Sequence, residues 1–218
     1  MNLEQARTNM IKQQIRTWGV ADNRVVEVLQ TVAREDFVPM RHRKLAFSDL
    51  RLPLGHDQVM MRPLEQGRLL QGLELKPSDR VLEVGTGSGF LTACLAALTE
   101  HVTSIERIAE LADRAAANLD SHGRANLTLL TGDVFEAGLE AGAYDAIVVT
   151  ASVPSVPEPF LQALRPGGRL FIVRGRSPAM EALIVHRDQD GKLSENSLFD
   201  TDLPRLHGTE EPEQFHFD

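Results

Sequence analysis

Three glycines alternate with small polar residues directly after an apolar run near the middle of the chain, and few folds accommodate such a segment. Residues 81–90 read Val-Leu-Glu-Val-Gly-Thr-Gly-Ser-Gly-Phe. Because glycine has no Cβ atom, a ligand can lie close against this backbone where a strand gives way to a helix. Open α/β sheets bind their ligands at this carboxyl edge of the strands. The segment therefore predicts a binding turn after the first strand of an α/β core.

Apolar runs and helical stretches alternate beyond this turn. Such alternation is typical of βαβ units, which build a parallel sheet with helices on both faces. Near the end, Asp-Gln-Asp-Gly at 188–191 separates two apolar runs, and Asp-Gly is a strong hairpin signal. We predict an α/β fold with a doubly wound, mostly parallel seven-stranded sheet of Rossmann-like type and a C-terminal antiparallel hairpin. The expected strands are 81–84, 102–105, 127–130, 146–149, 170–173, 182–185 and 193–198.

The residues before the core predict a helical cap. Apolar residues recur among polar ones in the first segment, and a second helix is expected after Asp22, a candidate N-cap. Residues 41–63 are rich in turn formers and predict an irregular segment that forms a wall of the substrate site. A helix over 64–73 follows. We expect one structural domain in three parts: a cap with the substrate loop at 1–76, a ligand-binding core at 77–206 and an acidic tail at 207–218.

Charge and cysteine content narrow the possible partners. The 218 residues include 23 Lys and Arg against 31 Asp and Glu, a net charge of −8. This field repels nucleic acid and anionic lipid, so we expect neither nucleic acid nor a membrane as partner. The single cysteine, Cys94, and seven scattered histidines give no metal-ligand spacing. We expect a cytoplasmic protein without a metal site; its oligomeric state stays open, and a monomer is compatible with the sequence.

The spacing of the glycines distinguishes between cofactors. A dinucleotide fingerprint, G-x-G-x-x-G, needs its third glycine at position 90, which is Phe90 here. The spacing G-x-G-x-G after the acidic Glu83 instead resembles the first motif of class I S-adenosylmethionine-dependent methyltransferases. That cofactor presents an ammonium, a sulfonium and a ribose diol rather than phosphates, so carboxylates near the turn suit it.

Acidic residues follow the next two expected strands. Glu106 lies 21 residues after Gly85, and a carboxylate at a strand tip can accept both ribose hydroxyls. NAD enzymes place an acid similarly, so Glu106 alone does not discriminate. Asp133 and Val134 supply an acceptor and a backbone N–H where an adenine edge would lie. We expect S-adenosyl-L-methionine to contact Glu83, Gly85, Thr86, Gly87, Gly89, Glu106, Arg107, Asp133 and Val134.

Longer segments resemble the protein-L-isoaspartate O-methyltransferase family. They include Arg-Glu-Asp-Phe-Val-Pro at 34–39, Leu-Pro-Leu-Gly at 52–55, Ser-Ile-Glu-Arg-Ile at 104–108 and the runs 144–151 and 164–170. The likeness extends from about residue 10 to 206. It implies an enzyme that methylates a carboxylate of damaged protein, with an isoaspartyl protein or peptide as substrate and a role in protein repair.

The chain departs from this family in the substrate loop. The family typically reads Gln-Thr-Ile-Ser-Ala-Pro-His, whereas residues 58–64 read Gln-Val-Met-Met-Arg-Pro-Leu, without the two hydroxyls and the histidine. Val134 also replaces a glycine that is common in the family. No catalytic residue is assigned. The candidate substrate residues are Asp49, Gln58, Val59, Met60, Met61, Arg62, Thr150 and Ser152.

The chemistry implied by the resemblance tolerates this loss. A carboxylate with a pKa of about 4 is already ionised at neutral pH, so displacement at a sulfonium methyl needs no general base. The enzyme must align the reacting atoms and exclude water, and positioning of this kind can supply ~7–11 kcal/mol. Losing loop hydroxyls therefore weakens orientation without removing a chemical step.

Alternatives remain open at the loop. Arg62 either presents its guanidinium to an anionic substrate or is solvated at the rim. Met60 and Met61 either line a pocket for an apolar acceptor or pack beneath the loop. Trp18 either anchors the N-terminal helix to the core or touches the substrate. Two alternative functions follow: a methyltransferase for another small or apolar acceptor, and a non-catalytic cofactor-binding protein.

Overall fold

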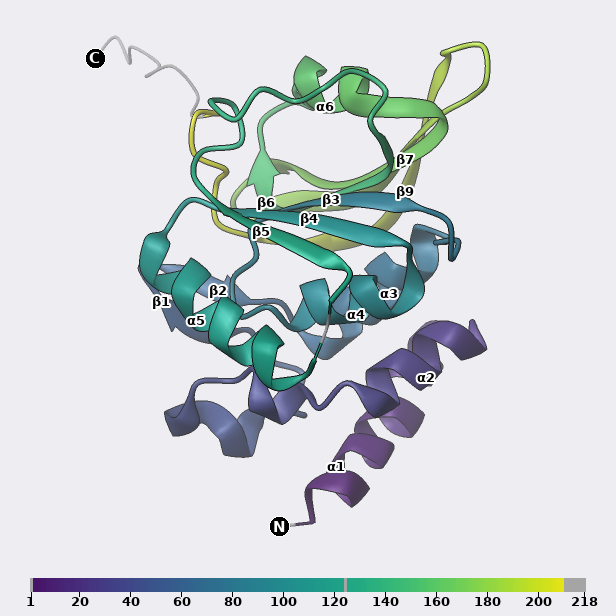
Figure 1. Ribbon diagram of the computed structural model, residues 1–218. Helices are drawn as coiled ribbons and strands as arrows, with labels where there is room; N and C mark the ends of the chain where they lie inside the picture. Colours follow the sequence, from purple (N-terminus) through teal and green to yellow (C-terminus); the bar gives the residue numbers. More distant parts are fainter. Residues whose placement is uncertain (1, 124, 210–218) are drawn as a thin grey trace, which may run out of the picture.

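A seven-stranded sheet with the order β5-β4-β3-β6-β7-β8-β9 forms the centre of the protein (Figure 1). The computed structural model describes residues 2–123 and 125–209. Strands β5, β4, β3, β6 and β7 run parallel, whereas β8 pairs antiparallel with β7 and with β9. The predicted α/β fold with a C-terminal antiparallel hairpin is confirmed. The strands are β3 (Arg80–Val84), β4 (His101–Glu106), β5 (Leu127–Thr131), β6 (Tyr144–Val153), β7 (Leu164–Arg176), β8 (Ala179–Arg187) and β9 (Leu193–Thr201).

Helices cover both faces of this sheet. In Figure 1, α3 (Pro63–Gly72), α4 (Phe90–Leu98) and α5 (Ala109–Ser121) lie below it, and α6 (Glu158–Ala163) lies above it. Because both faces are covered, neighbouring strand residues are buried on opposite sides: Ile147 and Val148 of β6 belong to two different apolar clusters. No helix in the described part of the chain has the length and apolar character needed to cross a lipid bilayer.

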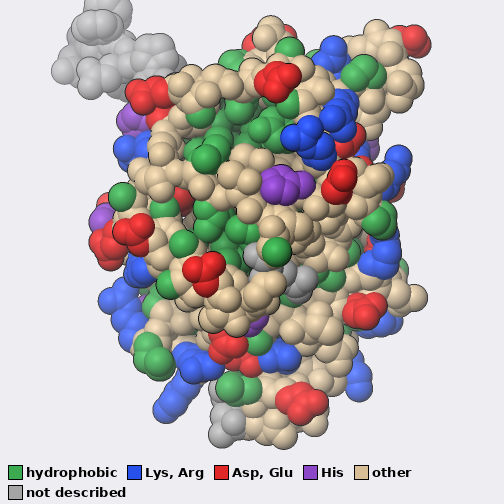
Figure 2. All heavy atoms as spheres, in the orientation of Figure 1, with side chains coloured by type: hydrophobic (Ala, Val, Ile, Leu, Met, Phe, Trp, Pro, Cys, Tyr) green, Lys and Arg blue, Asp and Glu red, His purple; other side chains and the backbone are tan. Residues whose placement is uncertain are grey.

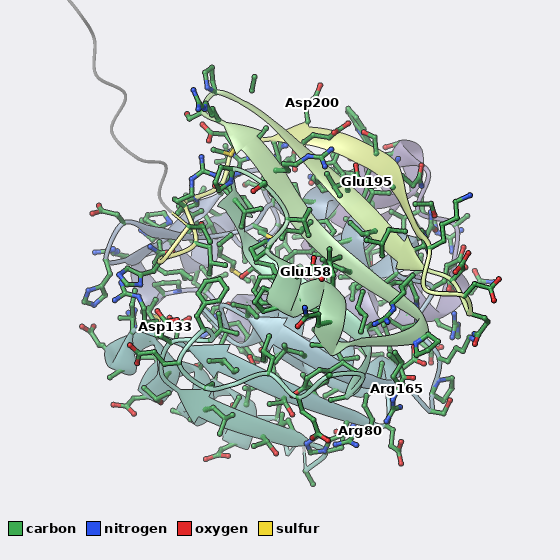
Figure 3. The ribbon with its side chains drawn as sticks, turned by 90° about the horizontal axis from the view of Figure 1, so that it is seen from above. Arg80, Asp133, Glu158, Arg165, Glu195 and Asp200 are labelled. Atoms are coloured by element: carbon green, nitrogen blue, oxygen red, sulfur yellow. The ribbon has the colours of Figure 1, made fainter. Side chains whose placement is uncertain are left out.

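The strand order reverses at β3. The chain proceeds from β3 to β4 and β5 on one side and then returns to β6 on the other, with Val84 of β3 aligned with Val149 of β6. Such a reversal leaves a crevice at the carboxyl ends of the two strands. Asp133 follows β5 at this edge, and in Figure 3 it lies far from Arg80 and Arg165, which begin β3 and β7 at the opposite edge.

Two helices precede the core, as the sequence predicts, and the second of them contacts α3 and α4. Helix α1 (Leu3–Met10) continues through a π-helical turn, Ile11–Ile15, and a 3-10 turn, Arg16–Trp18, before α2 (Asn23–Thr31). The Asp22 side chain accepts a hydrogen bond from the backbone N–H of Arg24 at 2.8 Å and caps α2. Trp18 is 60% exposed, so its interpretation as an anchor is wrong. The fully buried Ile15, at the end of the π-helical turn, packs into the hydrophobic core instead.

The segment expected to be irregular contains a small β-hairpin. Strands β1 (Leu52–Gly55) and β2 (Gln58–Met60) form a separate two-stranded antiparallel sheet. The sequence did not predict this hairpin, since Pro53 argues against a strand and the two turn residues are not a glycine-containing pair of the kind usual in tight hairpins. His56 and Asp57 both adopt left-handed backbone conformations, with φ of 52° and 56°.

Candidate functional site

Two connected pockets form a crevice at the carboxyl edge of the sheet. The first, which we call the edge pocket, has a cavity volume of about 100 Å³ and lies over the ends of β3, β4 and β5. The second, the loop pocket, has a cavity volume of about 30 Å³ and lies between residues 85–88 and the hairpin β1–β2. Gly85 and Thr150 line both pockets. Acidic and basic side chains are interspersed over the face shown in Figure 2.

The glycine turn is tied to β6 by Thr150. Its hydroxyl donates to the carbonyl oxygens of Val84 and Gly85, at 3.0 and 2.9 Å. Gly85 has a φ of 92°, and a Cβ atom there would stand 2.4 Å from the Thr150 Oγ1 atom. Only glycine fits both the conformation and the space, so the turn keeps a bare backbone facing the crevice.

Glu106 holds the other side of the glycine turn through hydrogen bonds to the backbone. Its Oε2 atom accepts the Gly87 backbone N–H at 3.0 Å, and its Oε1 atom accepts the Ile108 backbone N–H at 2.9 Å. The side chain is buried but lines the edge pocket. Since each carboxylate oxygen can accept a further hydrogen bond, Glu106 can still receive a pair of hydroxyls.

Asp133 and Val134 line the edge pocket below β5. Asp133 Oδ1 accepts the Phe135 backbone N–H at 2.9 Å, and its Oδ2 lies 3.0 Å from His207 Nδ1. Partial burial alone would raise the pKa of Asp133, but these two contacts outweigh it and hold the pKa below its ordinary value. Asp133 is therefore an ionised acceptor at neutral pH. Arg107 lines the same pocket. Of the expected acidic tail, residues 210–218 lie outside the described part of the chain.

Glu83 lies beneath the turn and lines neither pocket. It is completely buried, and its Oε2 atom accepts hydrogen bonds from the hydroxyls of Thr92 and Ser104 at 2.5 and 2.6 Å. Burial raises its pKa to about 7; the two hydroxyls oppose this shift and the nearby Glu106 charge adds to it. Ser104 in turn lies 2.6 Å from the Thr86 hydroxyl. Glu83 thus reaches the crevice only through Ser104 and Thr86.

The loop residues divide between two places. Val59, Met60 and Met61 line the loop pocket, and Gln58 lines the edge pocket. Both methionines are buried, so they pack beneath the loop and also face the pocket. The substrate-loop residues that replace the family's polar ones therefore give the loop pocket an apolar wall.

Arg62 and Asp49 lie in a different groove, which also contains Trp18 and Arg68. The Arg62 guanidinium contacts the carboxylates of Glu65 and Asp49, at 3.0 and 3.7 Å. Its backbone N–H donates to Glu65 at 2.9 Å and helps to begin α3. The guanidinium is therefore engaged by two acidic side chains outside the crevice.

Two further candidate residues, Ser152 and Gly89, lie outside the crevice. Ser152 is fully buried, and its hydroxyl donates to the Leu203 carbonyl oxygen at 2.8 Å, which ties down the segment after β9. Gly89 begins α4 and lines neither pocket. The crevice thus gathers these candidate residues: Gln58, Val59, Met60, Met61, Gly85, Thr86, Gly87, Glu106, Arg107, Asp133, Val134 and Thr150.

Sequence reasoning missed two polar residues at the loop pocket: Gln66, which lines it, and Arg34, which contacts Gln66. The Arg34 guanidinium donates to the carbonyl oxygens of Ala46 and Met61, both at 2.8 Å, and to the side-chain oxygen of Gln66. Nothing in a single sequence marks either residue, because an arginine or a glutamine near a helix end is usually solvated. Residues 2–123 and 125–209 contain no group of three or more His, Cys, Asp or Glu side chains that could hold a metal ion.

The chain matches a protein-family model over residues 5–203. That model describes protein-L-isoaspartate(D-aspartate) O-methyltransferase. A Koribacter versatilis protein-L-isoaspartate O-methyltransferase is 39% identical over 204 residues, which cover 94% of this chain and 91% of the relative. Protein-L-isoaspartate O-methyltransferase 2 of Pelobacter propionicus is 42% identical over 188 residues, which cover 86% and 84% of the two chains.

Solved structures show the same fold. A Plasmodium falciparum crystal structure, described as a protein-L-isoaspartate O-methyltransferase in complex with S-adenosyl-L-homocysteine, superposes with a TM-score of 0.79. It covers 94% of this chain and 98% of its own, at 22% sequence identity. At that identity the likeness establishes the shared architecture.

Proposed function

Since the chain belongs to the protein-L-isoaspartate(D-aspartate) O-methyltransferase family, we propose that it transfers a methyl group from S-adenosylmethionine to the carboxylate of an isoaspartyl residue in damaged protein. The observation that carries the proposal is the crevice where β3 and β6 part, with the bare turn at Gly85 on one side and the Glu106 carboxylate on the other. This is a place where an α/β sheet binds a nucleoside cofactor.

The residues of the crevice fit S-adenosylmethionine. Glu106 would hold the ribose hydroxyls on the free lone pairs of its two oxygens, and Asp133 with Val134 would bound the adenine. The turn at Gly85 leads from the edge pocket into the loop pocket, where the methionine half would lie against residues 85–87. When bound, the cofactor supplies a methyl group on a positively charged sulfur.

The protein's own residues align the reacting atoms and exclude water from them. An isoaspartyl carboxylate is ionised at neutral pH, so no side chain has to remove a proton. Met60 and Met61 present apolar surface at the loop pocket and keep water from the acceptor oxygen. Exclusion of water and fixed alignment are then the main contributions to the rate.

A direct assay tests this proposal. The protein is incubated with methyl-labelled S-adenosylmethionine and a peptide that contains one isoaspartyl residue; the matched peptide contains aspartate at the same position. We expect label on the isoaspartyl peptide that mild base releases, because the product is a methyl ester. Label that resists base, or equal labelling of the two peptides, would contradict an isoaspartyl carboxylate as the acceptor.

A second candidate function is methylation of another small or apolar acceptor. The apolar wall of Val59, Met60 and Met61 favours it, since methionine side chains adapt to irregular apolar ligands. In the same assay, transfer of label to a small aromatic acid but not to the isoaspartyl peptide would select this alternative.

We include a cytoplasmic location in the proposal. Cys94 is the single cysteine of the 218-residue chain and is buried in the core, so the fold needs no disulfide. The substrate class also fits, because repair of damaged protein is needed where proteins are used. Fractionation of cells that carry the tagged full chain would test the location, and recovery with the membranes would contradict it.

Replacing Glu106 tests the ribose assignment. We expect Glu106→Ala to weaken binding of S-adenosylhomocysteine by at least about tenfold, the loss of more than one hydrogen bond to a charged group. Glu106→Gln keeps the shape of the side chain but has one fewer acceptor oxygen, so its loss of affinity should be smaller than that of Glu106→Ala. Calorimetry measures both, with Glu140→Ala, an exposed carboxylate outside both pockets, as the control. Unaltered binding by Glu106→Ala would remove the assignment.

A further inference from the structure

Arg34 and Gln66 form a buried polar pair at the loop pocket, and the proposed function gives neither of them a role. Arg34 is 1% exposed and follows α2, whereas Gln66 is 3% exposed and belongs to the second turn of α3. Gln66 lines the loop pocket together with Met60 and Met61. A buried polar pair at an apolar pocket suggests a ligand group that it is placed to meet.

Arg34 is a buried cation that no carboxylate of the described residues contacts directly, although the charge of the nearby Glu65 acts on it. Its guanidinium donates to two backbone carbonyls and to the Gln66 side-chain oxygen, and its Cζ atom lies 5.0 Å from the centroid of the Phe90 ring. No ion pair to Arg34 occurs in residues 2–123 and 125–209. Burial lowers the pKa of Arg34 to about 9, so it still carries its charge at neutral pH.

The contact with Arg34 fixes which way the Gln66 amide is turned. A guanidinium has donors only, so Gln66 must present its carbonyl oxygen to Arg34. The amide Nε2 atom is then directed away from Arg34. Within the described part of the chain, the hydrogen bond that the Gln66 side chain makes is the one its oxygen accepts from Arg34. Gln66 therefore brings an uncommitted N–H donor to the lining of the loop pocket.

Two of the three hydroxyls that line the loop pocket donate to other protein groups, whereas the third, of Ser88, accepts the Phe90 backbone N–H. Ser104 donates to Glu83, so the Thr86 hydroxyl donates to Ser104. Thr150 donates to backbone carbonyls at the end of β3. A negatively charged group in the loop pocket can therefore meet the Gln66 amide beside the Ser88 hydroxyl, and the Arg34 charge lies directly behind the amide.

We propose that the Gln66 Nε2 atom, held in orientation by Arg34, donates a hydrogen bond to a carboxylate bound in the loop pocket. The inference rests on the proposed function, which brings two carboxylates to this crevice: that of the methyl acceptor and that of the amino-acid half of the cofactor. The chemistry of recognition is the same for both. Arg34 acts as a positioning residue, since it touches Gln66 and not the ligand.

The variant Gln66→Glu tests the proposal without disturbing the buried pair. A carboxylate of the same shape keeps the contact with Arg34 and gains an ion pair, so the fold is retained, but the N–H donor becomes an oxygen that repels another carboxylate. We expect the affinity for the carboxylate ligand to fall by about tenfold or more. The matched control is Gln162→Glu, an exposed position on α6.

Two measurements distinguish the sources. Calorimetry compares how the variant binds S-adenosylhomocysteine and 5′-methylthioadenosine, which lacks the amino-acid carboxylate. If Gln66→Glu loses affinity for S-adenosylhomocysteine only, Gln66 binds the carboxylate of the cofactor. If the variant has a raised KM for the isoaspartyl peptide but binds S-adenosylhomocysteine as the parent does, Gln66 binds the carboxylate of the methyl acceptor. Unchanged values in both would overturn the inference. Calorimetry needs no turnover, so an inactive parent protein would contradict the proposed function while this comparison still decides the role of Gln66.

Discussion

Gly85→Ala is expected to weaken binding of S-adenosylhomocysteine by about 100-fold or more, equivalent to roughly 2.7 kcal/mol. Two costs combine at this position. The backbone has a φ of 92°, where an L-residue is disfavoured by about 1–2 kcal/mol. The new Cβ atom would also stand 2.4 Å from Thr150 Oγ1, whose hydroxyl is fixed by two backbone carbonyls. Because Gly85 and Thr150 line both pockets, relief of the clash must distort the crevice.

Two further variants separate the clash from the backbone strain. Gly138→Ala introduces the same side chain at a φ of 71° where no atom lies within 4 Å, so it carries the strain alone and should bind normally. The double variant Gly85→Ala, Thr150→Ala removes the clashing oxygen, and the next atom, the Thr150 Cβ, is 3.8 Å away. It should recover a large part of the lost affinity. Normal binding by Gly85→Ala alone would show that the turn does not border the ligand.

Glu83→Gln is expected to flatten the pH dependence of stability between about pH 4.5 and pH 7. In the parent, burial raises the pKa of Glu83 to about 7 from an ordinary value of 4.5. Across this interval the folded state binds more protons than the unfolded state, so the free energy of unfolding falls as the pH rises. The loss contributed by one such group is on the order of 3 kcal/mol. Glutamine can still accept the hydroxyls of Thr92 and Ser104 but does not ionise.

Urea unfolding at pH 5 and at pH 8 measures this effect. The parent should lose more stability between the two values than Glu83→Gln does, so the variant gains relative stability at the higher pH. Glu140→Gln, which removes an exposed carboxylate, is the matched control for the change in net charge. Parallel pH profiles of the parent and Glu83→Gln would mean that Glu83 is ionised throughout the range.

Local patterns predicted most of the fold. Apolar runs of strand length marked all seven strands of the sheet, and Asp22 marked the start of α2, because these signals depend on neighbouring residues. The hairpin β1–β2 was missed because its turn at His56 and Asp57 uses left-handed conformations that the residue types do not announce. Trp18 was misplaced because a large aromatic side chain usually anchors its segment in the core, whereas here it lies in a short 3-10 turn and is mostly exposed.

The sequence predicted the site residues that belong to motifs and missed those that only tertiary packing brings to the site. Gly85, Glu106 and Asp133 follow successive strands, and parallel pairing brings their positions together at one edge. Glu83 belongs to β3 and Ser152 to β6, but each is completely buried and hydrogen-bonded to other residues of the protein instead of lining the crevice. The pairing of Arg34 with Gln66 spans 32 positions and depends on how the cap folds back on α3, which no local pattern encodes.

Calorimetric titration of the unaltered protein with S-adenosylhomocysteine, and separately with NAD⁺, tests the assignment of the crevice most directly. The glycine spacing, the carboxylate of Glu106 and the absence of a third glycine at Phe90 predict saturable binding of the first and none of the second. Saturation by NAD⁺, with no heat from S-adenosylhomocysteine, would contradict a sulfonium-nucleoside site at this edge of the sheet.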